Sequence, residues 1–183
     1  MILKQTSLSG VIVSESQLFS DQRGFFKRLF CEKELSIIWG ERQIVQINQS
    51  LTKNVGAIRG MHFQHPPYAE MKLVRCLKGK VWDVAIDLRA GSATFLKWHA
   101  EELSPDNSRM LVIPEGCAHG FQVLEENSEL LYLHSASYCS EAEGGVPYND
   151  PRLNIEWPLE IADISDRDLM HPLINPEFQG ILL

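Results

Sequence analysis

Short runs of β-branched and aromatic residues, each ended by Gly, Pro, Asn, Asp or Ser, dominate the sequence and constrain its fold most strongly. Many short strands with a turn about every 8–12 residues favour a sandwich, jelly roll or barrel. Helical signals are confined to residues 31–40, ending at Gly40, and to a capping-box pattern at residues 165–168. The predicted strands cover residues 10–16, 25–30, 43–50, 72–77, 80–88, 94–103, 110–114 and 130–138.

Residues 72–88 carry the clearest strand pattern. The link Lys78-Gly79-Lys80 is typical of a hairpin turn, so the two runs beside it are expected to pair. The second run alternates by period two, with Asp83, Ala85 and Asp87 on one face and Trp82, Val84, Ile86 and Leu88 on the other.

Length and charge limit the classes of function. A chain of 183 residues fits a single domain over residues 1–183. The formal net charge of −7 argues against non-specific binding to nucleic acid or to an anionic membrane. A local cluster of Arg and Lys could still bind an anionic small molecule.

Cysteine usage and the lack of long apolar runs predict a cytoplasmic protein. The cysteines form no C-x-x-C pair, and scattered thiols suit a reducing compartment. No run reaches the length of a signal peptide core or a membrane span. The four cysteines are Cys31, Cys76, Cys117 and Cys139.

The segment from residue 56 to residue 75 holds the most interesting polar side chains. By period two, His62 and Gln64 share one strand face, while Arg59 falls on the opposite parity. A bulge at Gly60 could turn Arg59 to the same side as His62. Composition alone favours a structural interpretation, in which His62 is a hydrogen-bonded core residue and Arg59 lies on the surface.

Other polar residues have equally ordinary explanations when each is taken alone. A lysine at a strand start, such as Lys72, is usually solvated. Tyr132 shares a strand face with Leu130 and His134 and could be core filler. Asp168 could cap its helix, and a lone histidine such as His119 is usually structural.

Together these segments resemble the nucleotide-sugar 4-keto-6-deoxyhexose 3,5-epimerases. The resemblance rests on DQRGFF, VQINQS, RGMHFQ, KLVR, KGKVWDVAIDLR, PEGCAHGF, NDPRLNIEWPL and ISDRD, in the family's order from about residue 10 to about residue 170. It implies an all-β cupin jelly-roll barrel with a few short helices. It also implies a homodimer in which N-terminal strands cross to the partner.

The resemblance assigns roles by position. It implies that His62 is the base, that Asp168 orients it, that Lys72 faces the sugar carbonyl and that Tyr132 returns a proton from the opposite face. It places Arg23, Arg59 and His119 near the diphosphate and sugar. It places Phe19, Phe26, Gln46, Asn48 and Tyr138 along the nucleotide and sugar pocket.

The implied reaction suits these residue types. Inverting a carbon beside a ketone needs a base near neutral pH and a cation for the enolate oxygen. An acid on the other face then completes the inversion. No cofactor and no metal is expected: the His-x-His pair that many cupins use for metal reads His62-Phe63-Gln64 here, His65 is out of phase, and His119 alone cannot complete a site.

Some positions depart from the family pattern. Arg28 stands where the family usually has Glu, near the nucleotide base. Glu70 stands where Gln is frequent. Leu133, which is followed by His134, stands where Lys is common. Arginine only donates hydrogen bonds, whereas thymine N3–H needs an acceptor. The substrate is therefore expected to be a nucleotide-diphosphate sugar, dTDP-linked in the family, with a CDP-linked form as a hypothesis. Arg28 could equally point to solvent.

Two other functions remain open at this stage. A ketoisomerase on the same barrel would move the carbonyl instead of inverting a centre, and a non-catalytic cupin would only bind sugar. Intact His62, Lys72, Tyr132 and Asp168 count against the second. The sequence leaves open whether C3, C5 or both are inverted.

Overall fold

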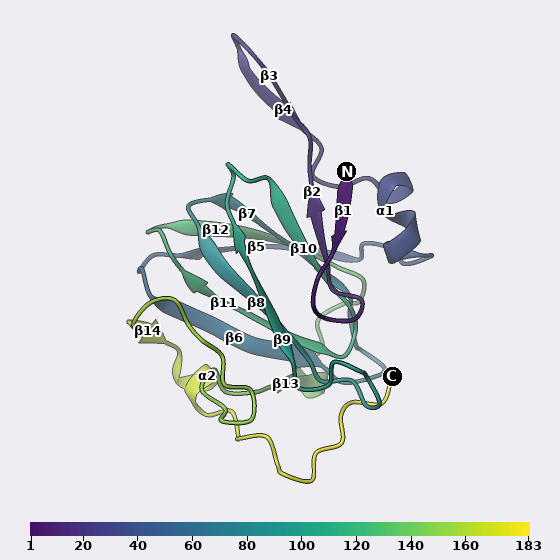
Figure 1. Cartoon of the computed structure of the whole chain (residues 1–183), viewed down its shortest axis with the longest axis vertical. Coiled ribbons are helices and arrows are strands. Elements are labelled where there is room, and N and C mark those ends of the chain that lie inside the picture. The colour runs from purple at the N-terminus through teal and green to yellow at the C-terminus, as the bar shows by residue number, and fades with distance from the viewer.

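The computed structural model describes residues 1–183, and two β-sheets that face each other form most of it (Figure 1). The first sheet has the order β1 (Ile2–Gln5), β2 (Ile12–Glu15), β10 (Arg109–Ile113), β7 (Lys72–Lys78), β12 (Ser128–His134) and β5 (Gln46–Thr52). The second has the order β13 (Glu143–Gly145), β6 (Ala57–Gln64), β11 (Cys117–Val123), β8 (Val81–Asp87) and β9 (Trp98–Leu103). The short β14 (Asp163–Ile164) pairs in parallel with β6. From β6 to β8 and from β10 to β12, successive strands change sheet, so the predicted jelly roll is confirmed.

The predicted hairpin at Lys78-Gly79-Lys80 is wrong. Strand β7 pairs with β10 and β12, whereas β8 pairs with β11 and β9, so this turn carries the chain from one sheet to the other. Gly79 has a φ of 72°, and a Cβ there would lie 2.4 Å from Ser128 Oγ. Ser128 Oγ also accepts the Lys80 N–H at 3.0 Å. The tight turn that suggested a hairpin is therefore real, but it joins sheets.

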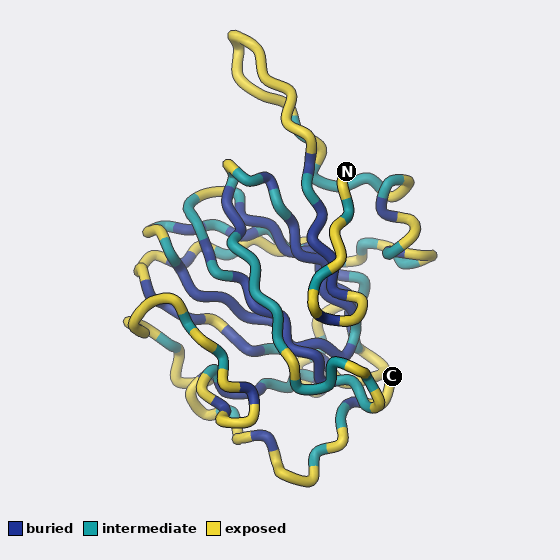
Figure 2. Tube along the Cα trace, in the orientation of Figure 1, coloured by how far each residue is buried: buried dark blue, intermediate teal, exposed yellow.

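Apolar side chains form three buried clusters. The largest lies between the sheets and includes Val74, Val81 and Phe121. A second lies between β8 and the C-terminal segment, which contributes Leu153 and Ile174. In the third, α1 (Glu32–Trp39) covers the outer face of the first sheet. Figure 2 shows the resulting buried trace through both sheets. The barrel interior is thus shielded from both sides and can keep a cavity at one end.

Strand β8 alternates as predicted, and both of its faces are buried. Trp82, Val84, Ile86 and Leu88 pack with the C-terminal segment, on the outer side of the sheet. Asp83 and Ala85 face the barrel interior, and Asp83 is fully buried. The polar face of this strand is therefore the one that supplies groups to the interior.

The helix predictions are confirmed, and several strand bounds differ from expectation. Helix α1 ends at Gly40, and Ser165 Oγ caps α2 (Asp166–Leu169) by accepting the Asp168 N–H. Residues 94–97 form a turn rather than strand, because Ser92 and Thr94 hydroxyls bond the Asp87 carboxylate. Strands β1, β3 (Leu18–Asp21), β13 and β14 were not predicted, and residues 140–142 form a 3₁₀ turn. None of the helices is both long and apolar enough to span a membrane.

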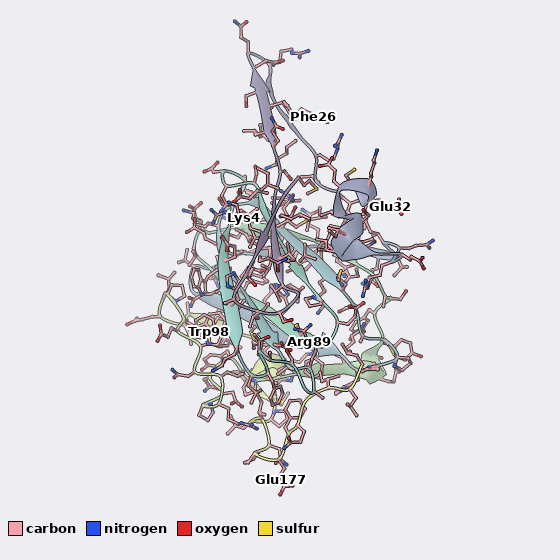
Figure 3. The ribbon with its side chains drawn as sticks, turned by 45° about the vertical axis from the view of Figure 1, so that its right-hand side comes forward. Lys4, Phe26, Glu32, Arg89, Trp98 and Glu177 are labelled. Carbon is pink, nitrogen blue, oxygen red and sulfur yellow. The ribbon has the colours of Figure 1, made fainter.

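A hairpin of β3 (Leu18–Asp21) and β4 (Gly24–Lys27) projects from the barrel, at the top of Figure 1. We call residues 18–27 the arm. Its strands pair only with each other. Phe19, Phe25 and Phe26 on it are 55%, 65% and 67% exposed, and Figure 3 shows Phe26 standing away from the barrel. A lone two-stranded hairpin is marginal in water, so the arm needs a further surface to pack on.

The sheet-switching turn gives a stability prediction. Gly79 and Gly91 have nearly equal φ angles of 72° and 73°, but a Cβ at Gly91 would meet nothing within 4 Å. Left-handed backbone strain should cost Gly91→Ala about 1–2 kcal/mol. Gly79→Ala adds crowding against Ser128 and should cost about 2–5 kcal/mol in total. Urea unfolding of both variants measures the difference, and equal losses would show that Ser128 yields without cost.

Candidate active site

A cavity of about 650 Å³ opens at one end of the barrel, between the two sheets. This size suits a small-molecule ligand. Nine of the side chains that the resemblance singled out line it: His62, Lys72, Tyr132, Asp168, Gln46, Asn48, Arg59, His119 and Tyr138. Strands β5, β7 and β12 of the first sheet and β6 and β11 of the second supply most of them.

His62 and Asp168 form a hydrogen-bonded pair at the cavity wall. Asp168 Oδ1 lies 2.7 Å from His62 Nε2, and Asp168 Oδ2 accepts the Gly60 N–H at 3.1 Å. Burial acts to raise the pKa of Asp168, but its hydrogen bonds with His62 and Gly60 outweigh it, so this pKa lies below the ordinary value. Asp168 is therefore ionised, and it uses both oxygens to hold the strand and the imidazole rather than its own helix.

The expected bulge at Gly60 is present. His62 pairs with His119 and Arg59 with Phe121, so Gly60 and Met61 together oppose Gly120 alone. A Cβ at Gly60 would lie 2.6 Å from Gly120 Cα, which explains why glycine occupies this place. The bulge puts Arg59 on the cavity side with His62, where Arg59 Nε donates to Thr52 Oγ1 at 2.8 Å.

Lys72 is buried and belongs to a charged network in the first sheet. Its Nζ lies 3.0 Å from Glu70 Oε1 and donates to the His62 carbonyl at 3.3 Å. Glu70 Oε2 also lies 3.2 Å from His134 Nδ1. Burial acts to raise the pKa of Glu70, but His134 and Lys72 outweigh it and hold this pKa below the ordinary value. Glu70 therefore carries a negative charge that partly balances Lys72.

Tyr132 lines the same cavity as His62 but belongs to the other sheet. Its hydroxyl lies 3.0 Å from Ser50 Oγ, and its ring meets His119 edge-on at a centroid distance of 6.1 Å. His119 is itself the cross-strand neighbour of His62 and bonds Asp83 at 2.8 Å. Burial raises the pKa of Tyr132, so its proton stays in place across the physiological range.

The outer part of the cavity is lined by polar groups with spare hydrogen-bonding capacity. Gln46 Oε1 accepts the Tyr138 N–H at 3.0 Å, and the Tyr138 hydroxyl donates to Glu143 at 2.8 Å. Glu143 pairs with Arg167. Asn48 Nδ2 lies 3.4 Å from His134 Nε2. These contacts tie the cavity mouth to the C-terminal segment.

Four of the expected binding residues lie outside this cavity. Phe19, Arg23 and Phe26 are on the arm, where Arg23 pairs with Asp21 at the tip. Arg28, at the base of the arm, is exposed and pairs with Glu34 on α1. Within one chain, Arg28 thus has the solvent-facing position that the sequence left open.

Three groups at the site have no functional role in the predictions from the sequence: Glu70, Ser50 and His171. The imidazole of His171 meets His62 edge-on at a centroid distance of 5.6 Å. Burial and the neighbouring His62 lower the pKa of His171. The spacing of three residues after Asp168 was the one signal that could have indicated His171.

The buried phenol gives a direct prediction. At about pH 10.5, half a unit above an ordinary tyrosine pKa, Tyr132 should still be protonated. The other tyrosines are Tyr68, Tyr138 and Tyr148, so subtracting the near-ultraviolet titration of Tyr132→Phe from that of the parent isolates Tyr132. A phenolate signal in that difference at or below this pH would contradict the buried environment.

Known proteins share both the sequence and this architecture. The family model for dTDP-4-dehydrorhamnose 3,5-epimerase matches residues 5–176. The enzyme of that name from Shigella flexneri is 42% identical over 166 residues, which cover 90% of this chain and 91% of the relative. The Bacillus anthracis enzyme, crystallised with TDP and PPi bound, superposes with a TM-score of 0.91 at 37% identity, covering 94% of this chain and 99% of its own. The Legionella pneumophila enzyme, solved in complex with dTDP-4-keto-L-rhamnose, gives 0.91 at 35% identity, covering 98% and 97%. The chain belongs to the dTDP-4-dehydrorhamnose 3,5-epimerase family.

Proposed function

We propose that this chain epimerises a dTDP-linked 4-keto-6-deoxyhexose at C3, at C5 or at both carbons. One observation carries the proposal. A carboxylate-backed imidazole on the second sheet and an ammonium group and a phenol on the first sheet line the same cavity. The chemistry of inversion needs these three kinds of group around one sugar ring.

His62 is the proposed base. Asp168 is the hydrogen-bond partner of His62 Nε2. His62 Nδ1 makes no hydrogen bond within the chain, so this atom is free to accept a proton from the carbon next to the ketone. The negative charge on Asp168 stabilises the imidazolium that forms, as an aspartate does beside other histidine bases. The Gly60 N–H keeps this carboxylate in place during the transfer.

Lys72 is the proposed partner of the enolate oxygen. Removing the proton moves charge to the ketone oxygen, and a fixed ammonium in a site shielded from water stabilises that charge. By analogy with the loss of one oxyanion donor, this contact is worth about 3 kcal/mol. Its bonds to Glu70 and the His62 carbonyl fix the ammonium before substrate arrives.

Tyr132 is the proposed acid. It lies on the sheet opposite His62, so its hydroxyl proton can reach the other face of the planar enolate carbon. The transfer leaves a phenolate, which Ser50 can stabilise by a hydrogen bond until solvent returns the proton. Both half-reactions are proton transfers, with no net oxidation.

Arg59 and His119 are the proposed contacts to the diphosphate and sugar inside the barrel, with Gln46, Asn48 and Tyr138 further out. The base-binding residues Phe19, Arg23 and Phe26, with Arg28, would come from the arm of a second subunit. The three exposed phenylalanines support this homodimer, because an apolar hairpin of this kind needs a surface to cover it.

The unpaired thiols support a reducing, cytoplasmic setting.

Hydrogen–deuterium exchange tests the epimerase directly. A dTDP-4-keto-6-deoxyhexose that is incubated with the protein in D₂O should gain deuterium at C3, at C5 or at both carbons. NMR measures this gain. His62→Ala should abolish exchange, and Asp168→Asn should slow it about 10⁴-fold, as for other histidine–aspartate pairs. Tyr132→Phe should slow inversion more than exchange, since abstraction does not use the phenol. His65→Ala is the matched control, because His65 itself does not line the cavity.

Each alternative has its own outcome in this experiment. Movement of the carbonyl group without inversion of a carbon would identify a ketoisomerase. Binding of the sugar nucleotide without deuterium exchange would identify a sugar-binding cupin. Absence of exchange with dTDP-, CDP- and GDP-linked substrates would remove the epimerase assignment. Faster turnover of the CDP-linked sugar would support a role for Arg28 at the base, and a strong dTDP preference would end that hypothesis.

The arm predicts complementation between two defective variants. Phe19→Ala/Phe26→Ala should raise KM about tenfold or more, because buried aromatic anchors carry much of binding energy. If the arm serves the partner, mixing this variant with His62→Ala should restore activity. One site of the mixed dimer then has an intact base and an intact arm. Light scattering should give two chains per particle, and failure to gain activity in confirmed mixed dimers would contradict the exchange of arms.

A further inference from the structure

His171 adds a third metal-binding side chain to the His62–Asp168 pair. Its Nε2 atom is buried and has no hydrogen-bond partner, and it lies 3.9 Å from Asp168 Oδ1. The same oxygen lies 2.7 Å from His62 Nε2. The donor atoms of the three residues all lie within 4.8 Å of one another. Two imidazole nitrogens therefore converge on one carboxylate oxygen.

The three side chains are held in place by their surroundings. The Gly60 N–H fixes the other oxygen of Asp168, and Ser165 caps the short helix that carries it. The ring of His171 packs on Gly145, where a Cβ would come within 2.2 Å of the ring. Figure 1 shows α2 beside β6, the strand of His62. Contacts within the chain therefore hold all three side chains in place.

We propose that His62, Asp168 and His171 form a binding site for a divalent transition metal such as Zn²⁺. Two imidazoles and a carboxylate are ligands that Zn²⁺ accepts, and sites with three protein ligands leave a fourth position open. Bonds of about 2.0–2.1 Å in tetrahedral geometry place neighbouring ligands about 3.3 Å apart. The separations of 2.7 and 3.9 Å from Asp168 lie on either side of that value, and all three donors lie within 4.8 Å of one another, so the side chains must shift to reach tetrahedral spacing. Two members of this set, His62 and Asp168, line the cavity.

Metal at this site inhibits the epimerase, a consequence that rests on the proposed function. A neutral imidazole bound to metal through Nε2 carries its remaining proton on Nδ1. Nδ1 of His62 then has no lone pair to accept the substrate proton, and Asp168 is diverted from the imidazole to the metal. Many cupins hold their metal through a His-x-His pair, and this pair is incomplete here because the segment reads His62-Phe63-Gln64. The proposed site therefore uses a different set of ligands, and the metal that it binds acts as an inhibitor.

Metal binding is measured first and without substrate. Equilibrium dialysis against Zn²⁺, followed by elemental analysis, should find one ion per subunit. Bound Co²⁺ should give the visible spectrum of a tetrahedral site. His171→Ala should weaken binding by more than about tenfold, since even changes next to metal ligands cost that much. His171→Asn is the second variant in case the smaller side chain impairs folding, which circular dichroism checks. His99→Ala, which removes a histidine paired with Glu101 on β9, is the matched control and should bind as the parent does.

Inhibition is measured next, by the deuterium exchange assay with and without Zn²⁺. Each protein's exchange rate with Zn²⁺ is divided by its own rate without Zn²⁺, so that any effect of the substitution itself cancels. This ratio should fall in the parent and in His99→Ala as the ion binds, and it should stay near one in His171→Ala. Failure of the parent to bind Zn²⁺, or equal binding by His171→Ala, would overturn the site. Binding that leaves exchange unchanged would overturn the inhibition. If no substrate is exchanged at all, the proposed function fails while the dialysis result still decides the metal site.

Discussion

The hydrogen bond between His62 and Asp168 is the contact on which the rest of the site depends. It joins residues 106 positions apart, one on a central strand and one on a short helix near the C-terminus. Strand β14 runs parallel to β6 just before that helix, and the Gly60 N–H binds the same carboxylate. The base therefore gains its partner only when the C-terminal segment has docked on the barrel. Docking of the C-terminal segment and orientation of the His62 imidazole therefore both depend on the Asp168 carboxylate.

The barrel interior supports chemistry because its buried ionisable side chains contact one another. Asp83 is fully buried, and burial raises its pKa, but His119 contacts one of its oxygens. Glu70 lies between Lys72 and His134. Isolated charges at such depth would be expensive, whereas paired ones can be held in fixed directions. The apolar cluster between the sheets and the clusters on their outer faces supply the stability that allows these polar groups at one end of the barrel.

Local patterns in the sequence predicted local structure well. The turn at Gly40, the cap at Ser165 and the bulge at Gly60 each depend on residues close in sequence, and all three are present. Pairing between distant strands could not be obtained this way. The turn at Gly79 has the same sequence signal whether it joins paired strands or opposite sheets. Alternation in β8 likewise could not tell which face is interior, because both faces are buried.

The same distinction between local and distant contacts explains which site residues meet in one chain. The nine predicted residues that line the cavity lie on strands of the two sheets or on segments packed against them, so the barrel itself brings them together. Phe19, Arg23 and Phe26 lie on a hairpin whose only strand partner is its own other half. Their position in the sequence says what they resemble, but no contact within this chain brings them to the cavity. The exposed apolar arm lacks a surface to pack on, and the open polar cavity lacks the predicted residues of the arm. The proposed homodimer answers both needs with one contact between two copies of the chain.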